Sequence, residues 1–486
     1  MTFVCLPDLI SIIKKTRNSE QSPAFQANQL LTLSKPTPEN LEIYFISNRH
    51  LIFLHELLNL SKNSLKLLFQ LLSVGWRASI RTKSVSGPQK SLFISHYFEN
   101  GESSIDLEDP FFGHIPYLSI KRGLVPVIHF INQVSSSLRI AQRMPEVNQT
   151  AIVVIGLNSL NAKLFLSYFN NLFIALKLFW RSFKANKYEG WLILRIAVAQ
   201  VSLQTFRNQI IAQHVIDEIQ TGEYNEIWLT FEGHAYERSI LNAIKESKID
   251  IDINLYQHAP IVPGQIGLME LLEDFGSIVN VYTSGLITYH FLQSAFPEFA
   301  GRIHVAGSIK HSPQNDPDRI NAIKKRHQLL FLPEGTAKSL YSFVNFAVAV
   351  STLDKSVKMI FRLHPNSPIK AAEEARNILR KSNIRVSDGT LIGDFRSSYA
   401  CIYRSSAAVI ESLNFGLLPI YFNPSGNREL DCLALSSIKY PVVDSAQSLV
   451  DLLNNQKLEF SGALFSDIEE FMEFSKMYFT PLVIDI

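Results

Sequence analysis

Three short stretches in the second half of the sequence carry residue types that bind phosphate. Each follows an apolar run typical of a buried strand, and they read Glu334-Gly335-Thr336, His364-Pro365 and Ser405-Ser406. The first and the third precede helical patterns. A helix N-terminus presents free N–H groups and a partial positive charge, so a hydroxyl or a glycine in front of it favours an anion. Two such helix starts with one histidine between them predict a phosphate site.

Each stretch also has an ordinary structural explanation. Ser405 and Ser406 are good N-cap residues, which is the commonest use of serine at such a place. His364 alone is typical of a satisfied histidine at a strand end, and Glu334-Gly335 of a simple turn. All three stretches, however, fall on the same edge of the same predicted sheet, and ligands of such sheets bind at the carboxyl ends of the strands. This coincidence favours one binding site over three unrelated turns.

Charged side chains accompany these stretches. Arg404 directly precedes the two serines. Arg362 stands two residues before the histidine, where it could add charge to the phosphate site or pair with a surface acid. Glu411 lies within the helix predicted after the serines, where its carboxylate either faces solvent or binds two ribose hydroxyls of a nucleotide. Both alternatives stay open for Arg362 and for Glu411.

The first half of the chain offers one candidate acid, in the stretch "TFEGHAYE". Glu232 ends an apolar strand, and a carboxylate in such surroundings can act as a general base whose pKa is raised by desolvation. Alternatively, Glu232 caps the helix that follows it. The sequence shows no obvious local partner for Glu232. His234 and Glu237 are three residues apart, a spacing typical of a pair on a helix surface.

Strands alternate with helices along most of the chain. This pattern predicts an α/β protein with two Rossmann-like doubly wound domains facing across a cleft. We expect helices over 235–248, 339–353, 371–382 and 467–477. We expect strands over 41–47, 90–98, 150–156, 225–233, 251–260, 277–285 and 302–308, and then over 327–335, 357–365, 383–389, 398–405, 417–422 and 439–444.

Composition shifts predict where the domains begin and end. Residues 1–39 form a lead-in segment without periodicity, and residues 40–311 form the N-terminal domain. A polar linker with two prolines follows at 312–319. Residues 320–465 form the C-terminal domain, and 466–486 contain a last helix that packs back on the first domain.

Length and charge bound the class of protein. A chain of 486 residues is expected to hold roughly two to four domains. With 46 basic and 44 acidic residues the net charge is +2, which argues against a general nucleic-acid binder. Cys5, Cys401 and Cys432 have neither metal-ligand spacing nor a CxxC pattern, so we expect reduced thiols in a cytosolic protein.

The most apolar stretch, Leu164 to Trp180, contains a serine, two asparagines and a lysine, and it is too short and too polar to span a bilayer. Three cations follow it, Arg181, Lys184 and Lys187. A buried amphipathic helix with a solvated end is the favoured interpretation. A helix that lies in a membrane interface is the alternative.

The pattern resembles the GT-B glycosyltransferases, and three motifs sharpen the resemblance. Bacterial sialyltransferases and polysialyltransferases that use CMP-activated sugars share an acid-acid-Gly motif, a His-Pro motif and a Ser-Ser motif. Here the matching residues are Phe231-Glu232-Gly233, His364-Pro365 and Ser405-Ser406, in the same order. Capsule Kdo transferases and the glycerophosphotransferases of teichoic acid synthesis have related motifs. Strings such as "YRSSAAVIESLNFGLLPIYF" also resemble bacterial surface-carbohydrate biosynthesis proteins, and the resemblance covers about residues 225–425.

The resemblance implies roles for individual residues. Glu232 would be the base that deprotonates the acceptor hydroxyl, and His364 would stabilise the leaving phosphate. The C-terminal domain would bind the nucleotide-sugar donor, with residues Glu334, Gly335, Thr336, Arg362, Pro365, Arg404, Ser405, Ser406 and Glu411. The N-terminal domain would face the acceptor, with His234 and with the strand end Tyr256, Gln257 and His258 before a Pro-Gly loop. Phe231 departs from the family, because the sialyltransferases have an acid there, and this puts the donor sugar in doubt.

We therefore expect a metal-independent GT-B glycosyltransferase without a cofactor. Its partners would be a nucleotide sugar, with a CMP-sugar favoured, and a surface polysaccharide or a lipid-linked glycan. It would be cytoplasmic, and peripheral contact with the inner membrane follows if the Leu164–Lys187 helix is interfacial. A UDP-N-acetylglucosamine 2-epimerase and a CDP-alcohol glycerophosphotransferase are the enzyme alternatives. A GT-B-like scaffold that binds without turnover is the non-enzyme alternative.

Overall fold

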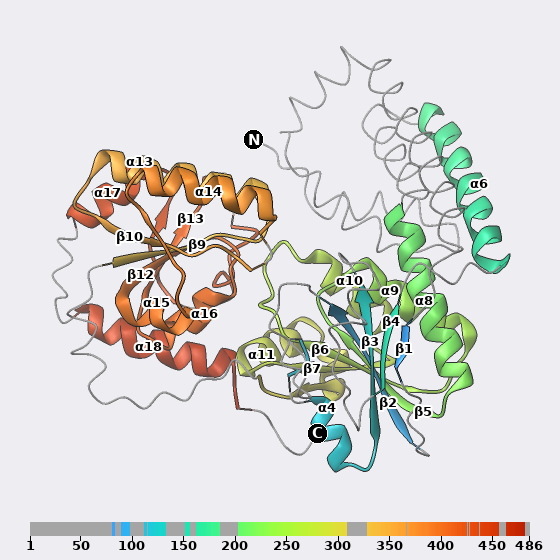
Figure 1. The fold of residues 1–486 in the computed structure, drawn as a ribbon. Coiled ribbons are helices and arrows are strands. Elements are labelled where there is room, and N and C mark those ends of the chain that lie inside the picture. The colour runs from blue at the N-terminus through green and yellow to red at the C-terminus, as the bar shows by residue number, and fades with distance from the viewer. Residues whose placement is uncertain are drawn as a thin grey trace. The chain divides into compact units, whose positions relative to one another are not determined.

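A computed structural model describes a large part of the chain (Figure 1). The described residues are 80–82, 89–97, 111–113, 115–132, 151–155, 162–184, 203–308, 328–365, 367–424, 426, 428–436, 438–455 and 463–481. They divide into two compact units. The described residues up to 255 and residues 266–279 form one unit, and residues 256–265 with the described residues from 280 onward form the other.

The N-terminal sheet contains eight strands among the described residues. Their order across the sheet is β1-β4-β3-β2-β5-β6-β7-β8. β1 is antiparallel to β4, whereas β2 is parallel to both β3 and β5. From β2 onward the order is that of a doubly wound sheet, and it reverses direction between β2 and β5. The bounds are β1 Ile80–Thr82, β2 Lys90–Tyr97, β3 Val125–Asn132, β4 Ala151–Ile155, β5 Tyr224–Thr230, β6 Asp252–Gln257, β7 Val279–Thr283 and β8 Ile303–Val305.

Among the described residues, helices stand between β2 and β3 and between successive strands from β4 onward, as crossover connections between parallel strands require. α8 packs on α9, and α6 packs on α8. The described helices are α4 Ile115–Lys121, α6 Ala162–Lys184, α8 Leu203–Thr221, α9 Ala235–Ser247, α10 Ile266–Phe275, α11 Leu286–Ala295 and the 3-10 helix η1 Pro297–Arg302.

The C-terminal sheet has six described strands, all parallel to their neighbours, in the order β11-β10-β9-β12-β13-β14. Counted from β9, this is the Rossmann order 3-2-1-4-5-6, with the switch point between β9 and β12. The bounds are β9 Gln328–Leu332, β10 Lys358–Phe361, β11 Arg385–Val386, β12 Ser398–Tyr403, β13 Leu418–Phe422 and β14 Val442–Val443.

Helices cover both faces of this sheet (Figure 1). α13 packs on α14 and α17 on one face, and α16 packs on α18 on the other. The bounds are α13 Ala337–Leu353, α14 Ile369–Lys381, α15 Leu391–Ser397, α16 Ala408–Leu413, α17 Ala446–Asn455 and α18 Ala463–Tyr478. Because both faces are covered, the central strands are apolar without alternation, and Leu329, Leu330 and Phe331 of β9 are all buried.

The segment after α18 ties together several turns of the second unit. α18 packs on α16 and also on α11. The Thr480 N–H donates to the Ser284 carbonyl at 3.0 Å, and the Ser308 N–H donates to the Thr480 carbonyl at 2.9 Å. A Cβ added to Gly285 would collide with the carbonyl oxygens of Met477 and Tyr478. Residue 285 must therefore be glycine for this segment to approach.

These observations confirm the predicted class, an α/β protein with two Rossmann-like domains. All the strands expected within the described residues are present, and α9, α13, α14 and α18 match the expected helices within four residues at each end. The described strands and α-helices that were not predicted from the sequence are β1, β3, α4, α8, α10, α11, α15 and α17. The expected lead-in segment 1–39, the strand at 41–47, Cys5 and the linker 312–319 lie outside the described residues.

Candidate functional site

Glu232 lies at the switch point of the N-terminal sheet. β5 ends at Thr230, beside β2, and the chain turns through residues 231–234 before α9 begins. Gly233 makes this turn with a φ of 76°. A Cβ there would lie 2.7 Å from the Gly267 carbonyl carbon and 2.9 Å from the Leu268 Cα. Residue 233 must therefore be glycine for two reasons: its left-handed conformation and the close approach of α10.

Glu232 has a local partner that the sequence did not predict. Its Oε2 lies 2.5 Å from the Nε2 of His234, and the His234 side chain is about half exposed. Glu232 does not cap α9 either. The N-cap residue is His234, whose N–H donates to Glu237 Oε2 at 2.9 Å. The sequence allowed Glu232 to be either a base without a local partner or the cap of the following helix. The structure shows instead that Glu232 pairs with His234.

Glu237 is the central acceptor beneath this pair. The expected helix-surface pair with His234 is wrong, because Glu237 is wholly buried. Its carboxylate accepts the Thr230 hydroxyl at 2.8 Å, and the Glu232 N–H at 3.2 and 3.3 Å. The Tyr236 hydroxyl donates to it at 3.3 Å. The Tyr236 hydroxyl also lies 3.0 Å from the Nε2 of His96, at the end of β2.

The charges of this cluster shift two pKa values strongly. Burial raises the pKa of Glu237 to about 7, although the His234 charge opposes the shift. Burial lowers the pKa of His234, but the hydrogen bond to Glu232 and the charges of Glu237 and Glu232 outweigh it, so the pKa rises to about 9. At neutral pH His234 is therefore protonated and ion-paired with Glu232, while Glu237 titrates. Perturbed groups of this kind are concentrated at functional sites.

The switch point of the C-terminal sheet lies between β9 and β12. Glu334 follows β9 and Arg404 follows β12, and their side chains form an ion pair with 3.8 Å between Arg404 Nε and Glu334 Oε1. Thr336 is the N-cap of α13, and its hydroxyl accepts the Ser339 N–H at 3.2 Å. The prediction that Gly335 and Thr336 precede a helix start at this edge is confirmed.

Ser405 and Ser406 stand in the turn after β12. The sequence analysis had them directly opening a helix, whereas α16 begins at Ala408 with Ala407 as the N-cap and without a side-chain cap. The Ser406 carbonyl accepts the Val409 N–H at 3.1 Å, which makes the turn into the helix. Neither serine is the N-cap, so the ordinary explanation for this pair does not hold. Glu411 lies on α16 and is half-buried.

His364 and Pro365 follow β10 at the same edge. The His364 carbonyl accepts the Ser367 N–H at 2.9 Å, so proline is the second residue of a four-residue turn, where its fixed φ is favourable. His364 is half-buried. Arg362 donates to the buried carboxylate of Asp394 at 2.8 Å and to the Gly389 carbonyl at 2.9 Å. Arg362 thus pairs with an acid, but that acid is buried, whereas the second alternative placed it on the surface.

Several buried polar atoms without a hydrogen-bond partner lie at this edge of the sheet, and Oε1 of Gln328, at the opposite edge, is another. Within the part of the chain that the structure describes, those at this edge include Oε1 of Glu334, Oγ of Ser339, Oγ of Ser367 and Oδ1 of Asn423. These residues follow β9, β10 and β13 or open α13. A buried polar group left without a partner costs about 1–3 kcal/mol. Four of them at the carboxyl edge of one parallel sheet indicate a site that a polar ligand or water completes.

The three residues expected on the acceptor side belong to the second unit and differ in their contacts. Tyr256 is buried and donates to the Gly307 carbonyl at 2.8 Å. Gln257 is wholly buried and accepts the Ser284 N–H and hydroxyl, both at 3.1 Å. Both side chains hold loops together. His258 is half-buried and stacks on Tyr256 with 6.5 Å between ring centroids, and it remains the candidate of the three.

Asp431 is a buried acid that sequence reasoning missed. It accepts the hydroxyls of Tyr403 and Tyr440, each at 2.7 Å, and both Arg428 Nε at 2.9 Å and the Leu433 N–H at 3.0 Å. Burial, followed by the Asp431 charge, raises the pKa of Tyr403 well above its ordinary value. The only sequence signal is an arginine three residues before an aspartate in a polar loop. The cluster fixes the loop after β13, where Asn423 lies.

No protein-family model and no curated protein sequence matches this chain. Among solved structures, it is similar to a UGT transferase from Siraitia grosvenorii in complex with UDP, with a TM-score of 0.46 and 9% identity over 79% of this chain and 95% of the other. It is similar to a glycosyltransferase from Rickettsia africae with a TM-score of 0.42 and 13% identity, over 80% of this chain and 94% of the other. It is also similar to a UDP-GlcNAc 2-epimerase from Methanocaldococcus jannaschii with a TM-score of 0.41 and 11% identity, over 75% of this chain and 92% of the other.

Proposed function

We propose that this chain is a glycosyltransferase that moves a sugar from a nucleotide-activated donor, with a CMP-sugar favoured, to a surface polysaccharide or a lipid-linked glycan. The observation that carries the proposal is the group of unsatisfied polar atoms at the carboxyl edge of the C-terminal sheet. Rossmann-type sheets bind nucleotides at this edge and at this switch point. The roles of individual residues follow from their places on it.

The donor would bind at the switch point between β9 and β12. Arg404 supplies a positive charge there, and its nearest acid, Glu334, is 3.8 Å away and has an oxygen without a hydrogen bond. The hydroxyls of Ser405 and Ser406 and the start of α13 would surround the phosphate. In this proposal these groups stabilise the phosphate, and the transfer step uses no metal ion. Glu411 on α16 would bind the ribose.

The transfer step needs a base and a stabilised leaving group. Glu232 would remove the proton from the acceptor hydroxyl, whose oxygen then forms a bond to the anomeric carbon of the donor. The bond between that carbon and the phosphate oxygen breaks, and the nucleotide leaves with both electrons. His364 would stabilise the charge on the departing phosphate by a hydrogen bond or by giving it a proton. His234, protonated and 2.5 Å from Glu232, would hold the base in place.

Thermal unfolding of the purified protein with CMP, CDP, UDP or GDP tests the proposal. A nucleotide at about 100 times its Kd should stabilise the protein by about 2.7 kcal/mol. We expect CMP to raise the unfolding midpoint most. Ser406→Ala should reduce the rise, whereas Ser382→Ala, at the half-buried C-cap of α14, should not.

The other outcomes point elsewhere. A response to UDP alone would redirect the proposal to UDP-sugar chemistry, including the 2-epimerase, and a response to CDP alone to a CDP-alcohol transferase. If none of the four nucleotides stabilises the protein, the proposed donor site is wrong. In that case the non-catalytic scaffold becomes the better account.

The lipid-linked acceptor draws support from α6. No helix among the described residues is long and apolar enough to cross a membrane. However, α6 is polar where it meets α8, because Asn171 and Gln209 exchange hydrogen bonds of 3.0 and 3.4 Å. Its exposed residues are mostly apolar or basic: Phe169, Phe173, Leu176 and Trp180, with Lys177, Arg181 and Lys184, and one asparagine, Asn170. The side chains of Phe173 and Trp180 are 68% and 67% exposed.

We therefore include in the proposal that α6 rests on an anionic lipid surface on the cytoplasmic side. Three cations beside an apolar stripe suit such a surface, and each is worth about 1 kcal/mol there. The protein should float with vesicles that contain an anionic lipid and much less with neutral ones. Phe173→Ser combined with Trp180→Ser should abolish flotation, whereas Leu353→Ser, an exposed apolar residue of α13, should not. Equal behaviour of the two variants would contradict this part of the proposal.

A further inference from the structure

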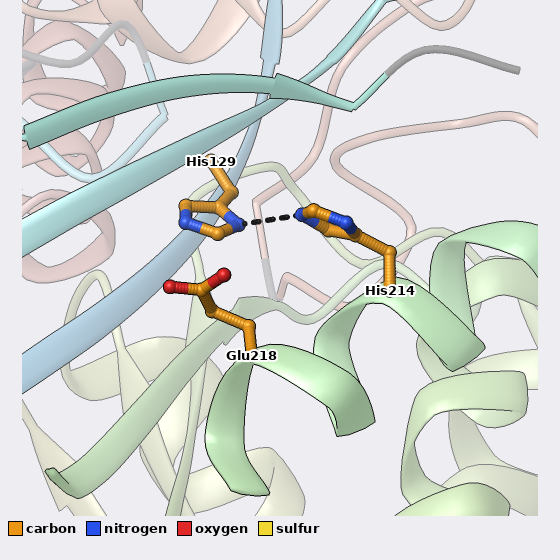
Figure 2. Close-up of side chains that lie close together, drawn as sticks. All are labelled: His129, His214 and Glu218. Carbon is orange, nitrogen blue, oxygen red and sulfur yellow. Dashed lines mark hydrogen bonds between the residues drawn. The ribbon is translucent and has the colours of Figure 1, made fainter. Parts of the chain in front are cut away.

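A second group of side chains lies away from the switch point of the N-terminal sheet. His129 comes from the middle of β3, and His214 and Glu218 come from α8 (Figure 2). Residues four apart on a helix share one face, so the histidine and the glutamate of α8 point to the same side. Figure 2 shows all three side chains converging on one point between the strand and the helix.

The three side chains are close enough together for one metal ion to contact all of them. One nitrogen or oxygen atom from each side chain lies within 4.8 Å of the others. His129 Nδ1 and His214 Nε2 are 3.1 Å apart. Two imidazole nitrogens on a tetrahedral zinc ion, with bonds of about 2.0–2.1 Å, would be roughly 3.3 Å apart. The pair is thus already at the spacing of two ligands, and His129 is wholly buried.

Tyr224 orients the third side chain. Its hydroxyl donates to Glu218 Oε1 at 2.9 Å. A hydrogen bond of this kind fixes the carboxylate of a metal ligand and is commonly found around metal sites. The Tyr224 ring reaches the end of α8 only because residue 222 is glycine, since a Cβ on Gly222 would lie 2.8 Å from the Tyr224 Cδ2.

We propose that His129, His214 and Glu218 bind one divalent transition-metal ion, with Zn²⁺ as the best fit to two imidazoles and one carboxylate. A water molecule would complete the coordination. The ion would join α8 to β3 and so stabilise this part of the N-terminal sheet. This site is separate from the proposed transfer site. The two proposals can fail independently, because the prediction of a metal-independent transfer step concerns Glu232 and His364.

The experiment uses the full chain without a histidine tag. Zn²⁺ content is measured by mass spectrometry after purification, and Co²⁺ is then added to the chelator-treated protein as a spectroscopic probe. We expect one metal ion per chain and visible d–d bands for bound Co²⁺. The unfolding midpoint should fall on chelation and recover with Zn²⁺. This measurement uses only the wild-type protein, so its result does not depend on whether a variant folds.

Substitutions measure how much each side chain contributes to Zn²⁺ binding. His214→Asn should weaken Zn²⁺ binding by more than 100-fold, and Tyr224→Phe should weaken it about 10–100-fold because the carboxylate loses its orienting hydrogen bond. His290→Asn, an exposed histidine of α11, is the matched control and should change nothing. If the wild-type protein takes up no metal, or if His214→Asn binds Zn²⁺ as the control does, the two histidines only share a hydrogen bond and the proposal is wrong.

Discussion

The two switch points of this chain carry similar residue types, but they differ in how many of their polar groups have hydrogen-bond partners. In the N-terminal sheet, the groups around Glu232 are satisfied by one another, with His234 on Glu232 and three N–H or O–H donors on Glu237 within 3.2 Å. In the C-terminal sheet, Glu334, Ser339, Ser367 and Asn423 each keep a buried polar atom without a hydrogen bond. At the first edge, Oγ of Ser95 near the end of β2 is also buried without a hydrogen-bond partner, so the two edges differ in how many polar groups lack a partner.

The difference separates two kinds of functional group. A general base must be held at one position with a set charge, so its neighbours are internal and rigid. A binding edge must exchange water for ligand, so its polar groups stay unmatched until the ligand arrives. The comparison therefore predicts that substitutions at the first edge change stability and turnover, and that substitutions at the second change affinity.

The largest effect should come from Glu232→Gln. If Glu232 is the base, the rate of sugar transfer should fall by about 10²–10⁴-fold because glutamine cannot take the proton. The rise in unfolding midpoint with the stabilising nucleotide should remain, since the proposed nucleotide site does not include Glu232. Steady-state rates with the corresponding nucleotide sugar check this. A variant that keeps full activity would leave the first edge without a catalytic role.

The rigidity of the first edge is tested by two glycines with nearly the same backbone angle. Gly233→Ala should cost about 3 kcal/mol, because it combines a left-handed residue with a collision against α10. Gly123→Ala has a φ of 78° but no atom within 4 Å of the added Cβ, so about 1 kcal/mol is expected. Urea unfolding gives both values. Equal costs would show that the close approach at Gly233 relaxes easily.

The pH dependence of stability should carry the signature of the same cluster. The pKa of Glu237 is raised from 4.5 to about 7 on folding, so its contribution is full below pH 4.5 and is lost as pH rises through 7. The loss is on the order of 3 kcal/mol. The pKa of His234 is raised from 6.5 to about 9, so its contribution is full below pH 6.5 and is lost as pH rises through 9.

Variants separate the two pH windows. Glu237→Gln should flatten the fall in unfolding free energy between pH 4.5 and 7, and His234→Gln should flatten the fall between pH 6.5 and 9. Urea unfolding of the three proteins at each pH measures this. If all three curves fall in parallel, the cluster does not titrate as described.

The smallest effects, about 1 kcal/mol, should have opposite signs at the second edge. Thr336→Ala removes the N-cap of α13 and should destabilise the protein by about 1 kcal/mol. Ser339→Ala removes a buried hydroxyl that has no partner and should stabilise it by up to about 1 kcal/mol, while weakening nucleotide binding. Loss of stability in Ser339→Ala would mean that the hydroxyl is already satisfied in the free protein.

The sequence predicts the edges well because they depend on local patterns. Apolar runs that end in small, hydroxylated or basic residues located the ends of β5, β9, β10 and β12. Each run is recognised from its own residues, without knowing which strands lie beside it in the sheet. The strand order, which brings β9 beside β12, depends on contacts between distant residues and was not predicted.

The misses have equally physical reasons. β3 was missed because Pro126 and His129 interrupt its apolar run, so the strand that carries the proposed metal ligand did not resemble one. Glu237 was placed on a helix surface because an acid in a first helical turn usually faces water. Its burial follows from packing against Thr230 and Tyr236. Asp431 lies in a polar loop whose burial no periodicity indicates.

The contact between residues 477–480 and the turns after β7 and β8 has a consequence for the order of folding. Ser284 bonds through its backbone to Thr480, 196 residues further along the chain. A ribosome must therefore synthesise nearly two hundred residues, including the whole C-terminal sheet, before the turn at Gly285 obtains its partner. Contacts of such sequence separation form slowly. This stretch is expected to wait, incompletely folded, on the nascent chain, where chaperones would have the most time to act on it.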